Sequence, residues 1–292
     1  MDALFGSLLS VAFHGLAYGM ILYAISVGLS VTMGLMGFVN LAHGVFARAG
    51  GYLMITFMES AGMPWLPALL AACVAVALAS MVLERLLYSR LYGATELEQV
   101  LLTIGLIFIA VAVARLAYGP NPTAAPLPEL LKGQVDFGGG RTFPAYRVAV
   151  ILTSAVLIAV LWIGLERTRW GAMVRAAVDN RAMAQSVGIN TSLLFTVTFA
   201  VGSGLAALGG ALGADLMAMS PTYPFEQLVY FLIVVAIGGL GNLRGPFVGA
   251  LIIGVGDTAC KYWVPQFGAF FVYVATIALL LWKPRGLFGR TA

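Results

Sequence analysis

Long apolar runs without a charged residue dominate the chain. A helix needs about 20 apolar residues to cross the roughly 30 Å of hydrocarbon in a bilayer, so most of these runs are long enough, or nearly so, to span it. The pattern predicts an all-α integral membrane protein, a polytopic bundle of about eight transmembrane helices, or nine, some of them short or broken. The uncharged runs are residues 3–47, 60–83, 99–114, 148–165, 182–214, 227–243 and 262–282.

Composition points the same way. Of the 292 residues 61% are hydrophobic and only 10% are charged, whereas soluble domains carry about 25% charged residues. The length leaves room for at most about ten crossings, so we expect one transmembrane domain over residues 1–292. The net charge of +4 is a modest excess of basic residues. In a membrane protein such an excess usually lies in the cytoplasmic loops, so it does not suggest nucleic-acid binding. Cys73 and Cys260 lie in apolar runs and are read as small buried hydrophobes.

The basic residues predict the orientation, because short cytoplasmic loops carry an excess of lysine and arginine. Segments 84–98 and 166–181 and the carboxyl-terminal tail are therefore placed in the cytoplasm. Residues 119–147, with five of the twelve prolines, are expected to form an extended external loop. Because the amino terminus lacks a basic region and a clear cleavage site, the first run is expected to remain as a span. The amino terminus would lie outside if that run crosses once without a break at Gly28 or Gly34.

Glycine is frequent, with 35 residues, and it clusters in the apolar runs. Membrane helices associate by close backbone approach, which small residues permit. The segment 202–214 carries small residues at spacings of three and four on all sides, so we expect its helix to be central. The clustering fits packing alone, and it also fits a mobile interface between subunits or half-bundles.

Two apolar runs are interrupted, at residues 34–44 and 238–246. Irregular backbone at membrane depth is tolerated only where it is buried in protein or faces water, and short broken segments point to a transport pathway. A helix–helix hydrogen bond is an equal alternative for His43. The candidate pathway residues here are Gly37, Asn40, His43, Gly239 and Asn242.

Few ionisable residues fall in or near the apolar runs. Asp257 and Lys261 are four residues apart on a predicted helix, so they face the same side and can neutralise each other. They are expected to form either a structural ion pair or part of the pathway lining. Arg115 and Asp215 stand at predicted span ends, where anchoring at the interface is favoured.

The chain lacks the patterns of several enzyme classes. There is no Gly-Lys dipeptide, which excludes a phosphate-binding P-loop, and with only His14 and His43 there is no zinc-binding H-E-x-x-H motif. Ser203 within Gly202–Gly204 is more readily a packing residue than a nucleophile. We therefore expect no catalytic residue, no metal and no cofactor in this chain.

The loop at 166–190 is amphipathic and rich in arginine. Asp179 or Asn180 can cap a short helix over 182–187, which Gly188 can end. Such a helix in a basic loop fits contact with anionic lipid. It equally fits docking of a cytoplasmic partner.

This loop resembles the cytoplasmic coupling segment of the permease subunits of bacterial ATP-binding-cassette importers, in particular the branched-chain amino acid family. The family's E-A-A-x-x-x-G core falls on Ala182, Met183, Ala184 and Gly188, without its usual glutamate. Residues 37–44 look like the family's N-x-A-H-G motif. Residues 238–245 look like its glycine turn, and residues 284–290 look like its P-x-G-L-x-G tail.

The resemblance implies a non-catalytic subunit of the bacterial inner membrane, with its carboxyl terminus in the cytoplasm. It implies a homologous second permease, which predicts a heterodimer, two ATPase subunits that bind ATP and Mg, and a periplasmic substrate-binding protein. The solute would be a branched-chain amino acid, or another small polar solute such as urea, an amide or a carboxylate, carried by alternating access. The residues implied in ATPase coupling are Arg169, Gly171, Arg175, Asp179, Ala182, Ala184 and Gly188.

An ion-coupled secondary transporter is the alternative class. In that case the Asp257–Lys261 pair would be the coupling site.

Overall fold

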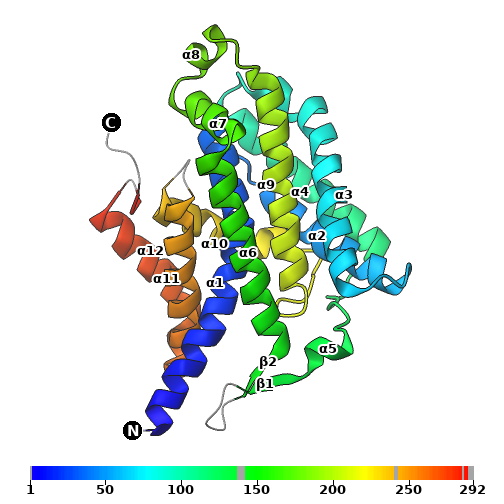
Figure 1. Cartoon of the computed structure of the whole chain (residues 1–292), viewed down its shortest axis with the longest axis vertical. Coiled ribbons are helices and arrows are strands. Elements are labelled where there is room, and N and C mark those ends of the chain that lie inside the picture. Colours follow the sequence, from blue (N-terminus) through cyan, green and yellow to red (C-terminus); the bar gives the residue numbers. More distant parts are fainter. Residues whose placement is uncertain (1, 137–141, 240–242, 285, 289–292) are drawn as a thin grey trace.

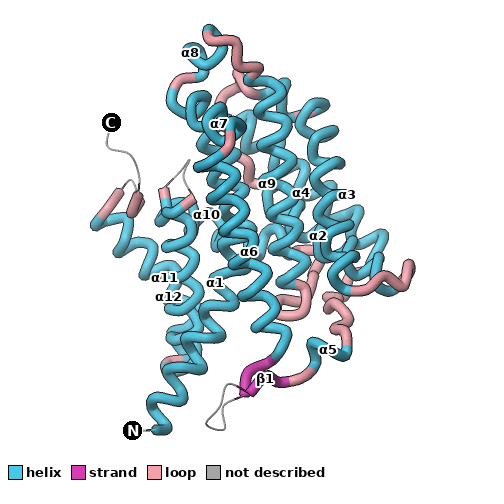
Figure 2. The backbone as a smooth tube through the Cα atoms, viewed as in Figure 1, coloured by secondary structure: helices cyan, strands magenta, loops and turns pink. Residues whose placement is uncertain are grey.

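The computed structural model describes residues 2–136, 142–239, 243–284 and 286–288, and this part of the chain is mostly helical (Figures 1 and 2). The all-α prediction is confirmed apart from one short hairpin. The elements in chain order are α1 Asp2–Met36, α2 His43–Glu59, α3 Trp65–Leu86, η1 Tyr88–Leu91, α4 Glu96–Tyr118, α5 Glu129–Lys132, β1 Gln134–Asp136, β2 Thr142–Pro144, α6 Ala145–Arg167, α7 Arg169–Asp179, α8 Arg181–Ser186, α9 Thr191–Gly213, α10 Tyr223–Gly238, α11 Arg244–Trp263 and α12 Pro265–Trp282.

Several of these helices are suited to a bilayer. Within the described residues, five are long and apolar enough to cross it, and shorter apolar helices lie at Tyr223–Gly238 and Phe270–Trp282. Helix α1 is continuous through Gly28 and Gly34, so the break considered at those glycines does not occur, and the first run is interrupted after Met36. The protein is thus an all-α polytopic membrane protein, while the count of eight or nine crossings stays a prediction. The five long helices lie in α1, α3, α4, α6 and α9.

Helix α9 is the centre of the bundle, as its small residues predict. It packs against α1, α2 and α3. A Cβ atom added to Gly210 would overlap the backbone of Ala47 in α2, and one added to Gly28 of α1 would overlap the backbone of Gly202. The helices are therefore in backbone contact at these crossings, which only residues without a Cβ allow.

The segment 119–147 differs from the extended loop expected for it. It contains α5 and an antiparallel hairpin in which Val135 of β1 pairs with Phe143 of β2, and α6 already begins at Ala145. Thr123 also pairs with Met219. The glycines at 138–140 lie outside the described residues. Strands of three residues leave no periodic signal in a sequence, which is why this hairpin was not expected.

The two ends of the molecule carry different features. Helices α7 and α8 lie at one end, and the amino-terminal end of α1 and the β1–β2 hairpin lie at the other (Figures 1 and 2). Arg244, the first residue of α11, forms an ion pair of 2.8 Å with Glu166 near the end of α6, so α11 starts at the α7–α8 end. Helix α11 consequently runs from that end towards the hairpin end.

Candidate functional site

Helix α7 folds back against the end of α6. The Thr168 hydroxyl caps α7 by accepting a hydrogen bond of 3.1 Å from the Gly171 amide. A Cβ atom on Gly171 would overlap the carbonyl of Leu165, and the Arg175 guanidinium donates a hydrogen bond to that same carbonyl. Gly171 and Arg175, both predicted as coupling residues, therefore fix the angle between α6 and α7.

Helix α8 is capped at both ends by local chemistry. Of the two predicted caps it is Asn180 whose side chain accepts from the Met183 amide, at 2.9 Å, so Asp179 is the last residue of α7 instead. Gly188 has φ +88°, and the Ile189 amide donates to the Ala184 carbonyl at 3.0 Å. This is a Schellman motif with glycine in the left-handed position. The predicted stop at Gly188 is confirmed.

One face of α8 is apolar and exposed. Ala184 is only 2% exposed, whereas Met183 and Val187 are 63% and 70% exposed. Met183 lies on α8 and Val187 is its C-cap residue, so the two side chains are about one turn apart at the end of the helix. Arg169 and Ala182 are also exposed. Sequence reasoning did not choose Met183 or Val187 as a coupling residue, although their i, i+4 spacing next to a predicted helix end was a usable signal.

A buried carboxylate lies beneath α8. Glu84 of α3 is 2% exposed and accepts hydrogen bonds from the Tyr92 hydroxyl and from the Thr196 hydroxyl of α9, the latter at 2.7 Å. The guanidinium of Arg181, the first residue of α8, lies 4.6 Å from the ring centre of Phe195, which is 5.5 Å from that of Tyr92. Glu84 thus ties α3 and α9 together next to the start of α8.

Ring contacts continue from this cluster to the interruption between α1 and α2. The ring centres of Tyr92 and Phe38 are 6.2 Å apart, and those of Phe38 and Tyr88 are 5.2 Å apart. The Tyr88 hydroxyl donates to Asn40 Oδ1 at 3.3 Å. A continuous path of side chains therefore links α8 to the predicted pathway residue Asn40.

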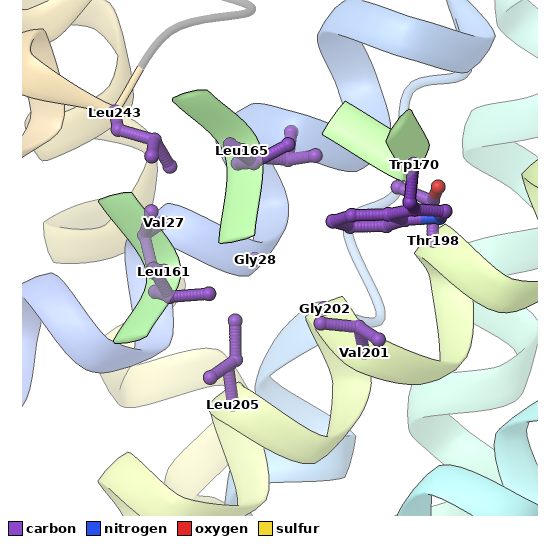
Figure 3. A pocket seen from close by; sticks show the side chains of 11 residues that line it. Val27, Gly28, Leu161, Leu165, Trp170, Thr198, Val201, Gly202, Leu205 and Leu243 are labelled. Atoms are coloured by element: carbon purple, nitrogen blue, oxygen red, sulfur yellow. The ribbon is translucent and has the colours of Figure 1, made fainter. Parts of the chain in front are cut away.

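A small apolar pocket lies behind α7 (Figure 3). Leu161 and Leu165 of α6 face it from one side, and Trp170 of α7 lies beside Thr198 of α9 at its edge. The indole nitrogen of Trp170 and the hydroxyl oxygen of Thr198 are buried without a hydrogen-bond partner in the part of the chain that the structure describes. The contact of α7 with α9 therefore leaves these two polar groups without a hydrogen bond from the described residues. The other residues that line the pocket are Val27, Gly28, Val31, Val201, Gly202, Leu205 and Leu243.

The backbone at residues 37–42 is non-helical and largely buried. Gly37 ends α1 with φ +61°, in the left-handed region that glycine tolerates. The Val39 amide donates to the Gln99 side-chain carbonyl at 3.0 Å. Gln99 thus supplies from α4 a hydrogen bond that a continuous helix would have made internally. Its role was not foreseen, because nothing in its spacing links it to Val39.

His43 begins α2 and is buried. Its Nε2 atom lies 3.0 Å from the Ile25 carbonyl of α1, so it donates there, while its Nδ1 atom has no partner among the described residues. The hydrogen bond between helices, one of the two alternatives for His43, is therefore present. Asn40 also keeps an unpartnered amide nitrogen. Arg48, which ends the longest uncharged run and was not singled out, is buried and donates to the Pro221 carbonyl.

The predicted glycine turn and the predicted tail motif meet in space. A Cβ atom on Gly238 would overlap Pro246, and Gly239 has φ +90°. The Leu287 amide donates to the Ile237 carbonyl at 2.7 Å, and Gly286 lies against the same end of α10. The tail therefore packs against the carboxyl-terminal end of α10 and donates a hydrogen bond to it. Asn242 lies outside the described residues.

Asp257 and Lys261 form the predicted ion pair on α11. Asp257 Oδ2 and Lys261 Nζ are 2.6 Å apart, with side-chain exposures of 2% and 53%. Of the two residues expected as anchors, Arg115 is exposed in α4. Asp215 follows α9, and burial raises the pKa of its carboxyl above the usual value, an effect that Arg147 opposes.

The structure thus separates the predicted site residues into distinct groups. The coupling residues lie on α7 and α8 or at their ends, and Asn40 and His43 lie at the interruption before α2. Gly239 joins α1 through a hydrogen bond of 3.5 Å from the Ser30 hydroxyl to its carbonyl. Within the described residues, no group of three or more His, Cys, Asp and Glu side chains is placed to hold a metal ion.

Broken helices in the core and a capped loop at one end are features of transport proteins of the membrane. The family model "Branched-chain amino acid transport system / permease component" matches residues 11–282. The chain belongs to this family, whose members are membrane permeases of ATP-binding-cassette transporters. The resemblance to the branched-chain amino acid permease family is confirmed.

Individual relatives agree over nearly the whole length. The chain is 25% identical to the high-affinity branched-chain amino acid transport system permease protein BraD of Pseudomonas aeruginosa, over 95% of this chain and 94% of that protein. It is 27% identical to the corresponding protein LivH of Salmonella typhimurium, with the same coverage. A shorter match, 31% identical over 41% of this chain, is to the fructose import permease protein FrcC of Rhizobium meliloti. No solved structure matches the chain.

Proposed function

We propose that this chain is the translocating subunit of an ATP-driven importer and moves its solute by alternating access. The α7–α8 element is the observation that carries this proposal. It is a rigid, doubly capped unit that presents Met183 and Val187 at one end of the bundle. An apolar exposed pair on a short helix fits a cleft on a partner protein better than it fits water.

The side-chain contacts of α8 would transmit a movement of that partner to the core of the bundle. Displacement of α8 would act on Glu84 through Arg181 and Phe195. It would also act through α7 on the pocket in front of the Gly28–Gly202 crossing. Coupling of this kind requires elements with two discrete arrangements that ATP binding in the partner biases.

The partners follow from the same proposal. ATP and Mg would be bound by two separate ATPase subunits, since this chain has no P-loop, and a homologous permease would complete a heterodimer. A periplasmic protein would deliver the solute, and the chain would lie in the inner membrane with its carboxyl terminus in the cytoplasm. The names of BraD and LivH support a branched-chain amino acid as the solute, with urea, amides and small carboxylates as alternatives.

Uptake by cells that lack this chain tests the proposal. We expect accumulation of labelled leucine to fall at least tenfold and to return when the chain is supplied. We also expect the purified chain alone to show no ATP turnover. ATP hydrolysis by the chain alone would refute the division of roles, and unchanged leucine uptake would refute the choice of solute.

Gly188 provides a second test, of the docking role of α8. Its φ of +88° is unfavourable by about 1–2 kcal/mol for a residue with a Cβ, least so for asparagine. Added atoms would meet no neighbour there, so only the end of α8 is perturbed. We expect Gly188→Val to reduce co-purification of the ATPase severalfold and Gly188→Asn to preserve it. Equal co-purification of both variants would contradict the docking role.

An ion-coupled secondary transporter is the second candidate, supported by the buried Asp257 carboxylate and its lysine partner. Uptake that survives loss of the ATPase and collapses with an uncoupler would establish it. Uptake that stops when the ATPase is lost would exclude it.

A further inference from the structure

The Asp257–Lys261 pair leaves one charged atom unexplained. Lys261 Nζ binds Oδ2 of the carboxylate at 2.6 Å, but Oδ1 is buried and has no hydrogen-bond partner among the described residues. A buried carboxylate oxygen without a donor is unfavourable, because it has lost its water without replacement. A purely structural ion pair does not account for this atom.

The surroundings of Oδ1 are polar. Helix α11 packs against α1 and α10, and the hydroxyls of Tyr18 on α1 and Tyr230 on α10 lie within electrostatic range of Asp257. Three helices therefore bring the Asp257 carboxylate and two phenol hydroxyls near one another.

The two charges differ in accessibility in a way that suits a ligand. Asp257 is 2% exposed and Lys261 is 53% exposed, so the ammonium group lies at the surface of this chain and the carboxylate lies beneath it. The lysine ammonium has three donors and uses one for Asp257, which leaves donors for an anion. A buried negative group beside an accessible positive group is complementary to a molecule that carries an ammonium and a carboxylate on the same carbon atom.

The pair also lies in the half of the bundle away from α7 and α8. Arg244 is at the α7–α8 end through its ion pair with Glu166, and Asp257 is 13 residues further along α11, which corresponds to about 20 Å of helix. In the proposed importer this is the side from which solute is delivered.

We infer that Asp257 and Lys261 form a binding station for the zwitterionic head of an α-amino acid. The carboxylate of Asp257 accepts the ligand's ammonium through Oδ1, and the ammonium of Lys261 binds the ligand's carboxylate. The inference rests on the proposed function and deepens it, because it identifies the part of the solute that this chain recognises. Ionisable residues at membrane depth that are paired in this way commonly mark solute pathways.

Ligands that carry only one of the two charges test the station. The probes are leucine, 3-methylbutylamine, which lacks the carboxylate, and 4-methylpentanoate, which lacks the ammonium. Binding is measured as the ligand-dependent rise in unfolding temperature of the full-length chain, purified together with its partner subunits. We expect the wild type to bind leucine more tightly than either fragment.

Each variant should lose affinity for the ligands that carry one of the two charged groups. In Asp257→Asn we expect affinity for leucine and the amine to fall about ten- to hundredfold, as for loss of one charged hydrogen bond, while 4-methylpentanoate is unaffected. Lys261→Gln, at a side chain that is 53% exposed, should lower affinity for leucine and 4-methylpentanoate and leave the amine unaffected, with extraction yield measured to show that the variant folds. Lys132→Gln, in the exposed ion pair with Glu129 on α5, is the matched control and should change nothing.

Other patterns would overturn the station. Equal losses for all three ligands would indicate a structural pair, and unchanged affinities would show that the ligand binds elsewhere. Stabilisation by sodium alone that Asp257→Asn abolishes, with leucine affinity intact, would make the pair a cation site. Failure of the proposed function is detected separately, as leucine uptake that does not depend on the chain. Whatever the uptake result, the binding pattern of the three ligands shows whether Asp257 and Lys261 bind the two charged groups.

Discussion

Gly210→Ala is expected to prevent the chain from accumulating as a folded protein. The added methyl group would overlap the backbone of Ala47, and neither backbone can move aside without separating α2 from α9. Overpacking of this kind is unfavourable by on the order of 3 kcal/mol. Because α9 also contacts α1 and α3, the displacement would spread through the bundle. The yield of monodisperse protein after detergent extraction measures the effect.

Gly105→Ala is the control for that experiment. Gly105 lies within α4, and a Cβ there would meet no atom within 4 Å. Alanine in a helix is favoured over glycine by about 0.5–1 kcal/mol, so yield and unfolding temperature should be unchanged or slightly raised. Normal yield and unfolding temperature for Gly210→Ala would show that the α2–α9 crossing is not in backbone contact.

The second large effect is expected at α8. Replacement of both Met183 and Val187 by aspartate should reduce ATP-dependent uptake at least tenfold, because charged side chains cannot enter an apolar cleft on the ATPase. Both side chains are mostly exposed, so the fold should survive, as judged by extraction yield. Uptake into proteoliposomes, with ATPase activity measured in parallel, separates loss of coupling from loss of protein.

A matched substitution at the other end of the molecule controls for the added charge. Val135 in the β1–β2 hairpin is exposed, and Val135→Asp should leave ATP-dependent uptake unchanged. If the Met183→Asp, Val187→Asp protein transports normally, α8 does not dock the ATPase and the proposed mechanism loses its coupling element.

Local features of the site were predictable because they depend on neighbouring residues. The cap and stop of α8 are properties of Asn180 and Gly188 and their immediate backbone. The Asp257–Lys261 pair follows from a spacing of four on one helix. These interactions close within one or two helical turns, so spacing alone specifies them.

The residues that sequence reasoning missed act across long separations. Gln99 reaches Val39, and Glu84 reaches Thr196 of α9. Arg175 was predicted in ATPase coupling, which stays a prediction, and its hydrogen bond to the Leu165 carbonyl was not foreseen. No periodic pattern distinguishes these partners, since each depends on which helices become neighbours.

The sequence by itself determined that the chain is a helical membrane protein, roughly where most of the long apolar helices lie, and which family it resembles. Those properties follow from the partition of apolar runs into lipid and from short motifs. The tertiary structure alone decided that the tail packs against the glycine turn, where the Leu287 amide donates to the Ile237 carbonyl. It alone showed that α8 is connected to Asn40 and that Asp257 Oδ1 has no donor among the described residues. Contacts between helices arise from packing of whole surfaces, which residue spacing along one helix does not encode.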